Sequence, residues 1–311
     1  MPVKKLISIV TPCYNEEENI DELCQRIAAI MATLSYDYEH ICIDNASTDS
    51  TVKKIKEIAT RDKRLKLIVN ARNFGHIKSP YYGILQSRGE ACILIASDLQ
   101  DPPEMIVEFI KKWEEGFKTV LAVKPESEES SIMFSIRKTY YNVIGKISDV
   151  PLIKNATGAG LFDHMVVDIL RNLNDSYPYF RGLLCEIGFP IATVSFKQPR
   201  RQRGVTKNNF YTLYDIAMLG ITNHSKLPLR LMAMGGFLLS ILSLLAAFGF
   251  LIAKLLFWNY FQIGISPILI GIFFFGAVQM FFIGLLGEYI ASIHTQVRNM
   301  PLVIEVERVN F

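Results

Sequence analysis

Two long stretches without a charged residue lie close together near the C-terminal end of this 311-residue chain, over residues 231–253 and 261–287. Each is longer than the roughly 20 residues that an α-helix needs to cross about 30 Å of hydrocarbon. A helical hairpin buried in a soluble core is the alternative, but two such stretches side by side in a chain of this size favour a membrane. The sequence therefore predicts two transmembrane helices within residues 229–290.

Basic residues predict the orientation of these helices. Positive residues precede the first stretch and follow the second, whereas the connection between them holds a single lysine, Lys254. The flanking residues are Arg200, Arg201, Arg203, Lys207, Lys226 and Arg230 on one side and Arg298 and Arg308 on the other. Because cytoplasmic loops are enriched in Lys and Arg, we expect a protein of the cytoplasmic (inner) membrane with both termini and the first two thirds of the chain in the cytoplasm.

Composition limits the partners of the remaining two thirds. There are 33 Lys+Arg against 30 Asp+Glu, a net charge of +3 at pH 7, which is too small to suggest a nucleic-acid partner. The cysteines are odd in number and show no Cys-x-x-Cys spacing, which predicts reduced, mostly buried thiols. They are Cys13, Cys24, Cys42, Cys92 and Cys185.

Within residues 1–205, short apolar stretches typical of β-strands alternate with helical patterns. The strand-like stretches are residues 6–10, 40–44, 65–69, 91–96 and 119–123. Such alternation predicts an α/β fold in which helices cover both faces of a mostly parallel sheet. Ligands bind such sheets beyond the carboxyl ends of the strands. Asp44, Asp98 and Lys124 stand at the ends of strand-like stretches and are therefore expected at this edge.

No glycine-rich phosphate loop accompanies this sheet. A Gly-x-Gly-x-x-Gly string does not follow the first strand, the nearest string (residues 158–163) lacks the third glycine, and there is no Gly-x-x-x-x-Gly-Lys-Ser/Thr loop. A bound diphosphate would have to be neutralised in another way, usually by a divalent metal on carboxylate and amide oxygens. Asp98 with Gln100 or Asp101 could hold such an ion; an aspartate that only caps a turn is the alternative.

Four motifs occur in order in the first third of the chain: residues 11–17 (Thr-Pro-Cys-Tyr-Asn-Glu-Glu), 44–49, 72–75 and 98–104. Arg201-x-x-Gly204-x-Thr206-Lys207, Pro228-Leu229-Arg230 and Gly287-Glu288-Tyr289 follow them. With the two apolar stretches, this set resembles the family 2 glycosyltransferases that load a sugar onto a polyprenyl phosphate, namely the bactoprenol-phosphate glucosyltransferases and dolichyl-phosphate mannose synthases. The resemblance covers nearly the whole chain.

The resemblance implies a GT-A, Rossmann-like domain over residues 1–205 and a two-helix transmembrane hairpin over 229–290. Between them, residues 206–228 would form a juxtamembrane amphipathic region, with a helix packed on the domain as the alternative; residues 291–311 would be a cytoplasmic tail. The implied reaction is inverting transfer of a hexose from a nucleotide sugar, UDP-glucose by default, to a polyprenyl phosphate such as undecaprenyl phosphate, with Mg²⁺ or Mn²⁺. Related enzymes can form tetramers through their membrane helices, so a homo-oligomer is a further expectation.

The resemblance also implies roles for individual residues. The nucleotide-sugar pocket would be lined by Pro12, Tyr14, Glu16, Asp44, Asp98 and Lys124, and the metal would be held by Asp98 and Gln100. The acceptor phosphate would meet Arg137, Lys138, Arg201 and Lys207; basic residues that only bind anionic headgroups are the alternative. The catalytic set would be Asp98, Lys124 and Asp163, and His76 is expected in a loop that faces the site.

The chain departs from the family pattern at three positions. Ala96 replaces the first aspartate of an Asp-x-Asp motif, and Asn45 replaces a second carboxylate after Asp44. Gly158 stands where some relatives carry an aspartate proposed as the base, and Asp163 lies five residues further on. A phosphate monoester has a second pKa near 6 and is largely ionised at neutral pH, so its oxygen needs positioning more than deprotonation. The departures therefore fit a phosphate acceptor without an obligatory general base.

Two other functions remain open. A catalytically degenerate membrane scaffold is favoured by the same three departures, whereas the retained Asp98 and Tyr-Asn-Glu turn argue against it. A processive polysaccharide synthase would carry a Gln-x-x-Arg-Trp motif and usually more membrane spans, and this sequence has neither.

Overall fold

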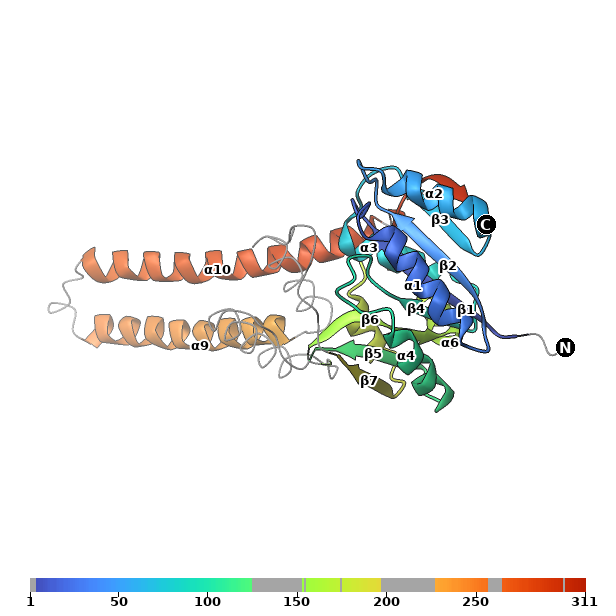
Figure 1. The fold of residues 1–311 in the computed structure, drawn as a ribbon. Helices are drawn as coiled ribbons and strands as arrows, with labels where there is room; N and C mark the ends of the chain where they lie inside the picture. Colours follow the sequence, from blue (N-terminus) through green and yellow to red (C-terminus); the bar gives the residue numbers. More distant parts are fainter. Residues whose placement is uncertain are drawn as a thin grey trace.

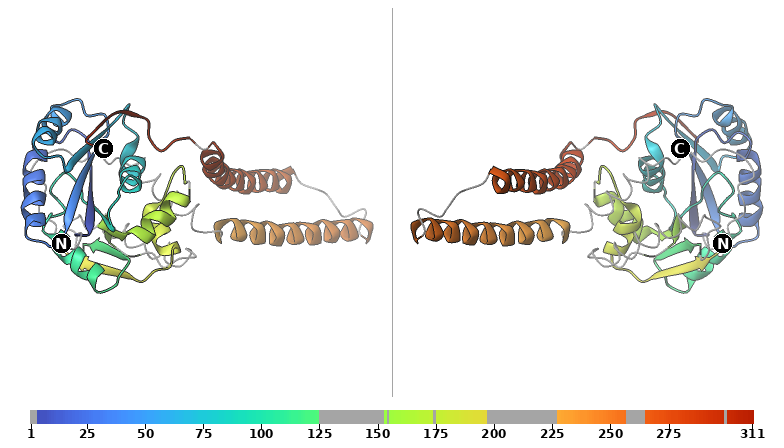
Figure 2. Two further views of the ribbon diagram at one scale, coloured as in Figure 1. Left: turned by 90° about the vertical axis from the view of Figure 1, so that its right-hand side faces the viewer. Right: turned by 90° about the vertical axis from the view of Figure 1, so that its left-hand side faces the viewer.

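The computed structural model describes residues 4–124, 153, 155–173, 175–196, 227–256, 265–298 and 300–311. An α/β domain carries two long helices that extend away from it side by side (Figures 1 and 2). Arg137, Lys138, Arg201 and Lys207, predicted to meet the acceptor phosphate, lie outside the described residues, as does most of the predicted juxtamembrane region.

In the described residues, eight strands form one sheet in the order β7-β5-β6-β4-β1-β2-β3-β8. The strands are β1 (Leu6–Cys13), β2 (Asp37–Asp44), β3 (Leu65–Asn70), β4 (Ala91–Leu94), β5 (Thr119–Val123), β6 (Ala156–Asp163), β7 (Ile191–Ser195) and β8 (Glu305–Val309). β1 is parallel to β2 and β4, β2 to β3, and β5 to β7. β6 and β8 run antiparallel to their neighbours. The predicted α/β fold with a mostly parallel sheet is thus confirmed.

Helices cover both faces of the sheet because each presents an apolar stripe to it. On one face lie α1 (Ile20–Ala32), α2 (Thr51–Arg61) and α4 (Met105–Glu114), which bury Ile27, Ile55 and Phe109 against the strands. On the other lie α3 (Gly75–Leu85), α6 (His164–Asn172) and α7 (Phe180–Glu186), which bury Tyr81, Leu170 and Leu184. Each fully buried side chain of this kind contributes roughly 1.5–3 kcal/mol, so the two cores hold the sheet edges in fixed positions.

Both predicted apolar stretches are helical, in α9 (Leu227–Leu256) and α10 (Ile265–Val297). The two helices come close at Gly235, where a Cβ atom would lie 3.9 Å from the Phe282 ring. Met234, Phe237, Met280 and Phe281 are 67–70% exposed. Within the described residues, Phe274–Val297 is long and apolar enough to cross a membrane, and Leu227–Ser243 is a shorter apolar segment. By length and composition, one of the two predicted spans is supported and the second is not confirmed.

The C-terminal residues return from α10 to the sheet. β8 pairs antiparallel with β3, with Leu67 opposite Val309 and Ile68 opposite Arg308. Beyond the strand, the Asn310 side-chain amide donates to the carbonyl oxygens of Ala59 at 2.9 Å and Leu65 at 2.8 Å. The segment expected as a tail over residues 291–311 is therefore the end of α10 followed by an edge strand. This pairing puts the first and last parts of the chain in one rigid sheet.

Candidate active site

The predicted donor-site residues converge at the carboxyl edge of the parallel strands. Cys13, the last residue of β1, pairs with Asp44, the last residue of β2. Asp98 follows β4, which lies on the other side of β1. Lys124 follows β5 and donates its backbone N–H to the Asn155 carbonyl just before β6. The sheet therefore brings together side chains that are far apart in the sequence.

Two polar turns at this edge are cross-linked by hydrogen bonds. The Asn15 backbone N–H donates to Ser47 Oγ at 2.9 Å, and the Thr48 N–H donates to Asn15 Oδ1 at 2.8 Å. The Glu16 N–H donates to Thr51 Oγ1 at 2.8 Å. Asn15 has a φ of 57°, in the left-handed region that asparagine tolerates better than most residues. The turn that carries Tyr14 and Glu16 is thus held in place by the turn that follows Asp44.

Asp44 is fully buried beneath these turns. Its carboxylate accepts hydrogen bonds from the backbone N–H of Ser47, at 2.9 Å, and from the Ser47 hydroxyl. Burial raises the pKa of Asp44, while the bonds from Ser47 oppose that shift. Asp44 therefore fixes the turn from below, at the end of β2 where the sequence predicts nucleoside contacts.

Asn45 uses its amide in a way that a carboxylate could not. Its Nδ2 donates to Asn73 Oδ1 at 2.8 Å and to the Gly75 carbonyl at 3.2 Å. Its Oδ1 accepts from the Phe74 N–H at 2.9 Å and from Asn70 Nδ2 at 3.2 Å. Asn45 thus joins β2 to the Arg72–Gly75 motif, through bonds in which its amide both donates and accepts.

The segment after β4 carries Asp98 and Gln100, the predicted metal ligands, and Asp101, the alternative to Gln100. The Gln100 backbone N–H donates to Asp98 Oδ1 at 3.2 Å, and Leu99 between them has a φ of 57°. Asp101 is only 7% exposed, and its Oδ1 has no hydrogen-bond partner among the described residues. Burial, and next the charge of Asp98, raise the pKa of Asp101 to about 7, while Lys124 acts in the opposite direction.

These residues fit a divalent cation. Mg²⁺ and Mn²⁺ prefer oxygen ligands, and Mg²⁺ is commonly held by one or two carboxylates plus substrate phosphates. A buried carboxylate oxygen without a partner is costly, and a cation between Asp98 and Asp101 would satisfy it. The structure thus favours Asp101 as the second carboxylate; the predicted role of the Gln100 side chain stays a prediction.

A cavity of about 270 Å³ opens beside Asp101. Its polar lining includes His76, Thr157 and Arg181, and its sheet side includes Pro12, Ala96 and Gly158. The remaining lining is mostly apolar: Ile77, Pro80, Tyr81, Ile84, Leu94, Ala159, Pro178, Tyr179 and Phe180. His76 thus faces the site as predicted, although it lies in α3 rather than in a loop. Burial, with the nearby Arg181 charge, lowers the pKa of His76.

Arg181 is a charged cavity residue that the sequence analysis did not single out. Its Nη1 donates to the Ala156 carbonyl at 2.9 Å, which fixes the guanidinium beside the first residue of β6. It belongs to none of the motifs noted in the sequence, and only the packing of α7 against β6 brings it to the site.

Asp163 lies at the other end of the sheet. It pairs with Ala91, the first residue of β4, whereas Asp98 follows the last. Its Oδ2 accepts from Trp113 Nε1 at 2.7 Å and from Lys118 Nζ at 2.9 Å, and its Oδ1 caps α6. Burial alone would raise the pKa of Asp163, but these bonds hold it below its ordinary value. Because β6 runs antiparallel to β4, the catalytic role expected of Asp163 does not fit its position, and the residue is structural.

Comparison with known proteins finds relatives that are similar over nearly the whole chain. The family model described as glycosyl transferase family 2 matches residues 8–158. The chain is 33% identical over 297 residues to an uncharacterized glycosyltransferase of Synechocystis sp., covering 95% of this chain and 93% of the relative. It is 31% identical over 296 residues to a prophage-derived bactoprenol glucosyl transferase of Shigella flexneri, covering 95% and 96%. A prophage bactoprenol glucosyl transferase homolog of Escherichia coli K12 is 30% identical over 296 residues, with coverage of 95% and 96%.

Among solved structures, a glucosyl-3-phosphoglycerate synthase from Mycobacterium tuberculosis, in complex with Mn²⁺, UDP and phosphoglyceric acid, superimposes with a TM-score of 0.47 at 18% identity. That match covers 70% of this chain and 76% of the synthase. On the sequence similarity to its relatives, the chain belongs to glycosyl transferase family 2 and is a glycosyltransferase.

Proposed function

We propose that this enzyme transfers a hexose from a nucleotide sugar to a polyprenyl phosphate such as undecaprenyl phosphate. UDP-glucose is the first candidate for the donor. The reaction would take place at the cytoplasmic face of the inner membrane. Relatives named bactoprenol glucosyl transferase, similar over 95% of this chain, support the acceptor class. The observation that carries the proposal is the attachment of α10 to the catalytic sheet through β8. An apolar helix joined directly to the sheet would hold the active site at the headgroup depth of a lipid acceptor.

The same attachment supports two membrane crossings rather than one. The chain leaves the sheet after β7 and is back in it at β8, so any crossing by α10 needs a second crossing in the opposite direction. Between β7 and α10, the long helix of the described residues is α9, which has 30 residues and is apolar over most of its length. We therefore propose the hairpin over residues 229–290, with residues 1–205 and the C-terminal residues on the cytoplasmic side.

For the donor, we propose that the cross-linked turns bind the nucleoside, with Asp44 holding them from below and Pro12, Tyr14 and Glu16 at the edge of the pocket. Asp98 and Asp101 would hold Mg²⁺ or Mn²⁺, which when bound neutralises charge on the departing nucleotide diphosphate. Lys124, at the end of β5 and within electrostatic range of Asp101, would attract the donor phosphates. The cavity beside Asp101 would receive the sugar.

For the acceptor, an oxygen of the lipid phosphate would attack the anomeric carbon as the bond to the nucleotide diphosphate breaks, with inversion. The largely ionised phosphate already carries the electron pair that attacks, so the enzyme's task is to position it. Glycine rather than a carboxylate at position 158 is consistent with that task. Arg137, Lys138, Arg201 and Lys207 remain the proposed acceptor-phosphate residues, and assembly into a homo-oligomer remains part of the proposal.

The test uses the purified full-length chain in lipid with undecaprenyl phosphate, Mg²⁺ or Mn²⁺, and a panel of nucleotide sugars. Sugar on the lipid is measured for the wild type, for Asp98→Asn and for the matched control Asp168→Asn, which alters an exposed carboxylate paired with Arg171. We expect metal-dependent transfer that Asp98→Asn abolishes and Asp168→Asn preserves. Transfer that survives Asp98→Asn unchanged would contradict the proposed site.

The departures at Ala96 and Gly158 favour one other function, that of a membrane scaffold without activity. The transfer assay with the panel of nucleotide sugars distinguishes the transferase from the scaffold. A folded protein that binds nucleotide but transfers no sugar from any donor to the lipid would identify the scaffold.

A further inference from the structure

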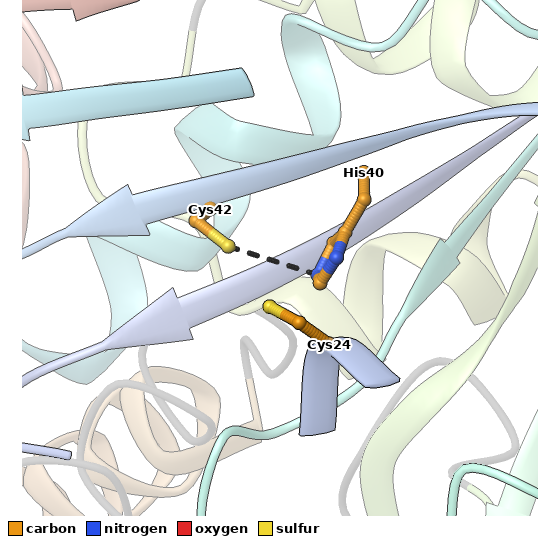
Figure 3. Close-up of side chains that lie close together, drawn as sticks. All are labelled: Cys24, His40 and Cys42. Carbon is orange, nitrogen blue, oxygen red and sulfur yellow. Dashed lines mark hydrogen bonds between the residues drawn. The ribbon is translucent and has the colours of Figure 1, made fainter. Parts of the chain in front are cut away.

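Three sulfur- and nitrogen-bearing side chains meet on the sheet face covered by α1 and α2. Cys24 projects from α1, and His40 and Cys42 project from β2 on the same side, because residues two apart in a strand share a face (Figure 3). All three are buried, and their potential ligand atoms lie within 4.8 Å of one another. None of the three is part of the donor site described above.

The spacing of these atoms is close to that of a tetrahedral metal site. Zn²⁺ binds thiolate sulfur at about 2.3 Å and imidazole nitrogen at about 2.0–2.1 Å, so tetrahedral angles place neighbouring ligand atoms roughly 3.5–3.8 Å apart. Here Cys42 Sγ lies 3.7 Å from His40 Nε2. Small side-chain adjustments would bring Cys24 Sγ to the same separation.

The cluster also has access to solvent. A cavity of about 290 Å³ is lined by Cys24 and His40 and by the carboxylate-bearing residues Asp21 and Asp62, with Tyr38 and Arg61 among the rest. This cavity provides an entry path and space for a water molecule as fourth ligand. Three protein ligands with one open position is a common arrangement for zinc.

The donor set differs in kind from the proposed site of Mg²⁺ or Mn²⁺. Thiolates and imidazole select soft or borderline ions such as Zn²⁺, whereas Asp98 and Asp101 offer only hard oxygen ligands. The two sites lie at different places in the fold, but β2 connects them, because Cys42 precedes Asp44 by two residues. His40 is further joined to β1, since its Nε2 lies 2.9 Å from Thr11 Oγ1.

We propose that Cys24, His40 and Cys42 form a second metal site of this protein, one that binds a single Zn²⁺. On binding, the two thiols release their protons to solvent and His40 Nε2 gives up its hydrogen bond with Thr11 Oγ1. The two thiolates and the neutral imidazole Nε2 then become ligands, and a water from the adjoining cavity completes the tetrahedron. No oxidation or reduction takes place. The site is independent of the proposed transfer reaction.

The first test is a titration of the reduced, chelator-treated full-length protein with Co²⁺, a spectroscopic substitute for Zn²⁺. We expect one equivalent to give a thiolate-to-cobalt charge-transfer band and the strong visible bands of tetrahedral Co²⁺, both removed by Zn²⁺ and not by Mg²⁺. Cys24→Ser and Cys42→Ser should each lower the affinity by more than about 100-fold, beyond what loss of an outer-shell partner costs. Cys185→Ser, which alters a half-buried thiol outside the cluster, should leave the titration unchanged.

A second test needs no variant. Alkylation of the wild-type cysteines, followed by mass spectrometry, should show that Zn²⁺ slows modification of Cys24 and Cys42 and leaves Cys185 unaffected. Octahedral cobalt spectra without a charge-transfer band, or equal Zn²⁺ affinity in the wild type and Cys24→Ser, would overturn the proposal. Neither measurement depends on glycosyl transfer, so failure of the zinc site and failure of the proposed function are distinguishable.

Discussion

Asp101 carries the most unusual charge environment of the site. It is buried, lies near a second carboxylate and has an oxygen without a partner in the described part of the chain. A raised pKa means that the folded protein holds the proton more tightly than the unfolded chain does. Below about pH 4 both states are protonated and Asp101 has no effect, whereas between pH 4 and 7 the unfolded state ionises first and the folded state loses relative stability.

Asp101→Asn should therefore stabilise the metal-free protein, and more so at pH 8 than at pH 5. The shift from 3.8 to about 7 sets an upper limit of roughly 4 kcal/mol at about 1.36 kcal/mol per pKa unit. Thermal unfolding midpoints in detergent with a chelator, at both pH values, measure the effect. Asp168→Asn is the control and should show no such pH dependence; equal midpoints for Asp101→Asn and wild type at pH 8 would contradict the expected strain at Asp101.

Gly158 stands where the sequence resemblance places a proposed base in some relatives; its φ is +112°, and no atom of the described residues is within 4 Å of an added methyl group. Gly158→Ala and Gly158→Asp introduce the same backbone strain, and only the second adds a carboxylate. Since an ionised phosphate needs no base, we expect their kcat values for transfer to agree within about threefold. A kcat at least tenfold higher for Gly158→Asp than for Gly158→Ala would show that deprotonation limits the reaction.

At the scale of elements, β6 is the strand on which the site depends most. It runs antiparallel between β4 and β5, and its first residues border the cavity while its last residue, Asp163, caps α6. The backbones of β6 and β5 approach each other closely at Gly160. A Cβ atom at this position would clash with the Val120 carbonyl oxygen of β5. A glycine is required here for close approach of two backbones.

Gly160→Ala should accordingly lower the stability of the protein by about 2–3 kcal/mol or more, because backbone atoms have to move. The control is Gly249→Ala in α9, where no neighbouring atom of the described residues lies within 4 Å of the added methyl group. That change should shift stability by less than about 1 kcal/mol, in the favourable direction of helix propensity. The measurement is the thermal unfolding midpoint of each variant. Equal midpoints for Gly160→Ala and Gly249→Ala would mean that β5 and β6 are not paired as described.

At the scale of the whole molecule, β8 determines how the catalytic domain and the apolar helices are connected. The Lys56–Glu307 ion pair at 2.6 Å and the β3–β8 ladder hold the C-terminal residues on the domain. Exposed ion pairs contribute little by themselves, so the ladder and the Asn310 bonds are the main attachment. The two ends of the chain must then lie on the same side of a membrane.

Cysteine labelling tests this topology in a Cys185→Ser background. Glu57→Cys on α2 and Val306→Cys on β8 both place a thiol at an exposed position, and Trp258→Cys lies in the connection between α9 and α10. A membrane-impermeant maleimide is added to right-side-out vesicles and, separately, to inside-out vesicles. Glu57→Cys and Val306→Cys should be labelled in the same vesicle preparation, and Trp258→Cys in the other. Reaction of all three from one side would eliminate the two-span hairpin.

Local pattern was enough to predict much of this protein. The strands β1 to β5 were recognisable because each is a short apolar stretch followed by polar residues, and the positions of Asp44, Asp98 and Lys124 at one edge follow from parallel pairing. The apolar helices follow from composition alone. β6 was missed because Gly158 and Gly160 interrupt its apolar alternation, and β8 because three of its five residues are charged.

The amino-acid sequence by itself determined the strand–helix alternation, the family motifs at the carboxyl edge and the apolar character of α9 and α10, since hydrophobicity and residue spacing are local properties. Only the tertiary structure decided that Asp163 lies opposite the site, that Asp101 is buried beside Asp98, and that Cys24 meets His40 and Cys42. The physical reason is that burial, unpaired polar atoms and clusters arise from contacts between distant segments, which depend on strand direction and helix packing.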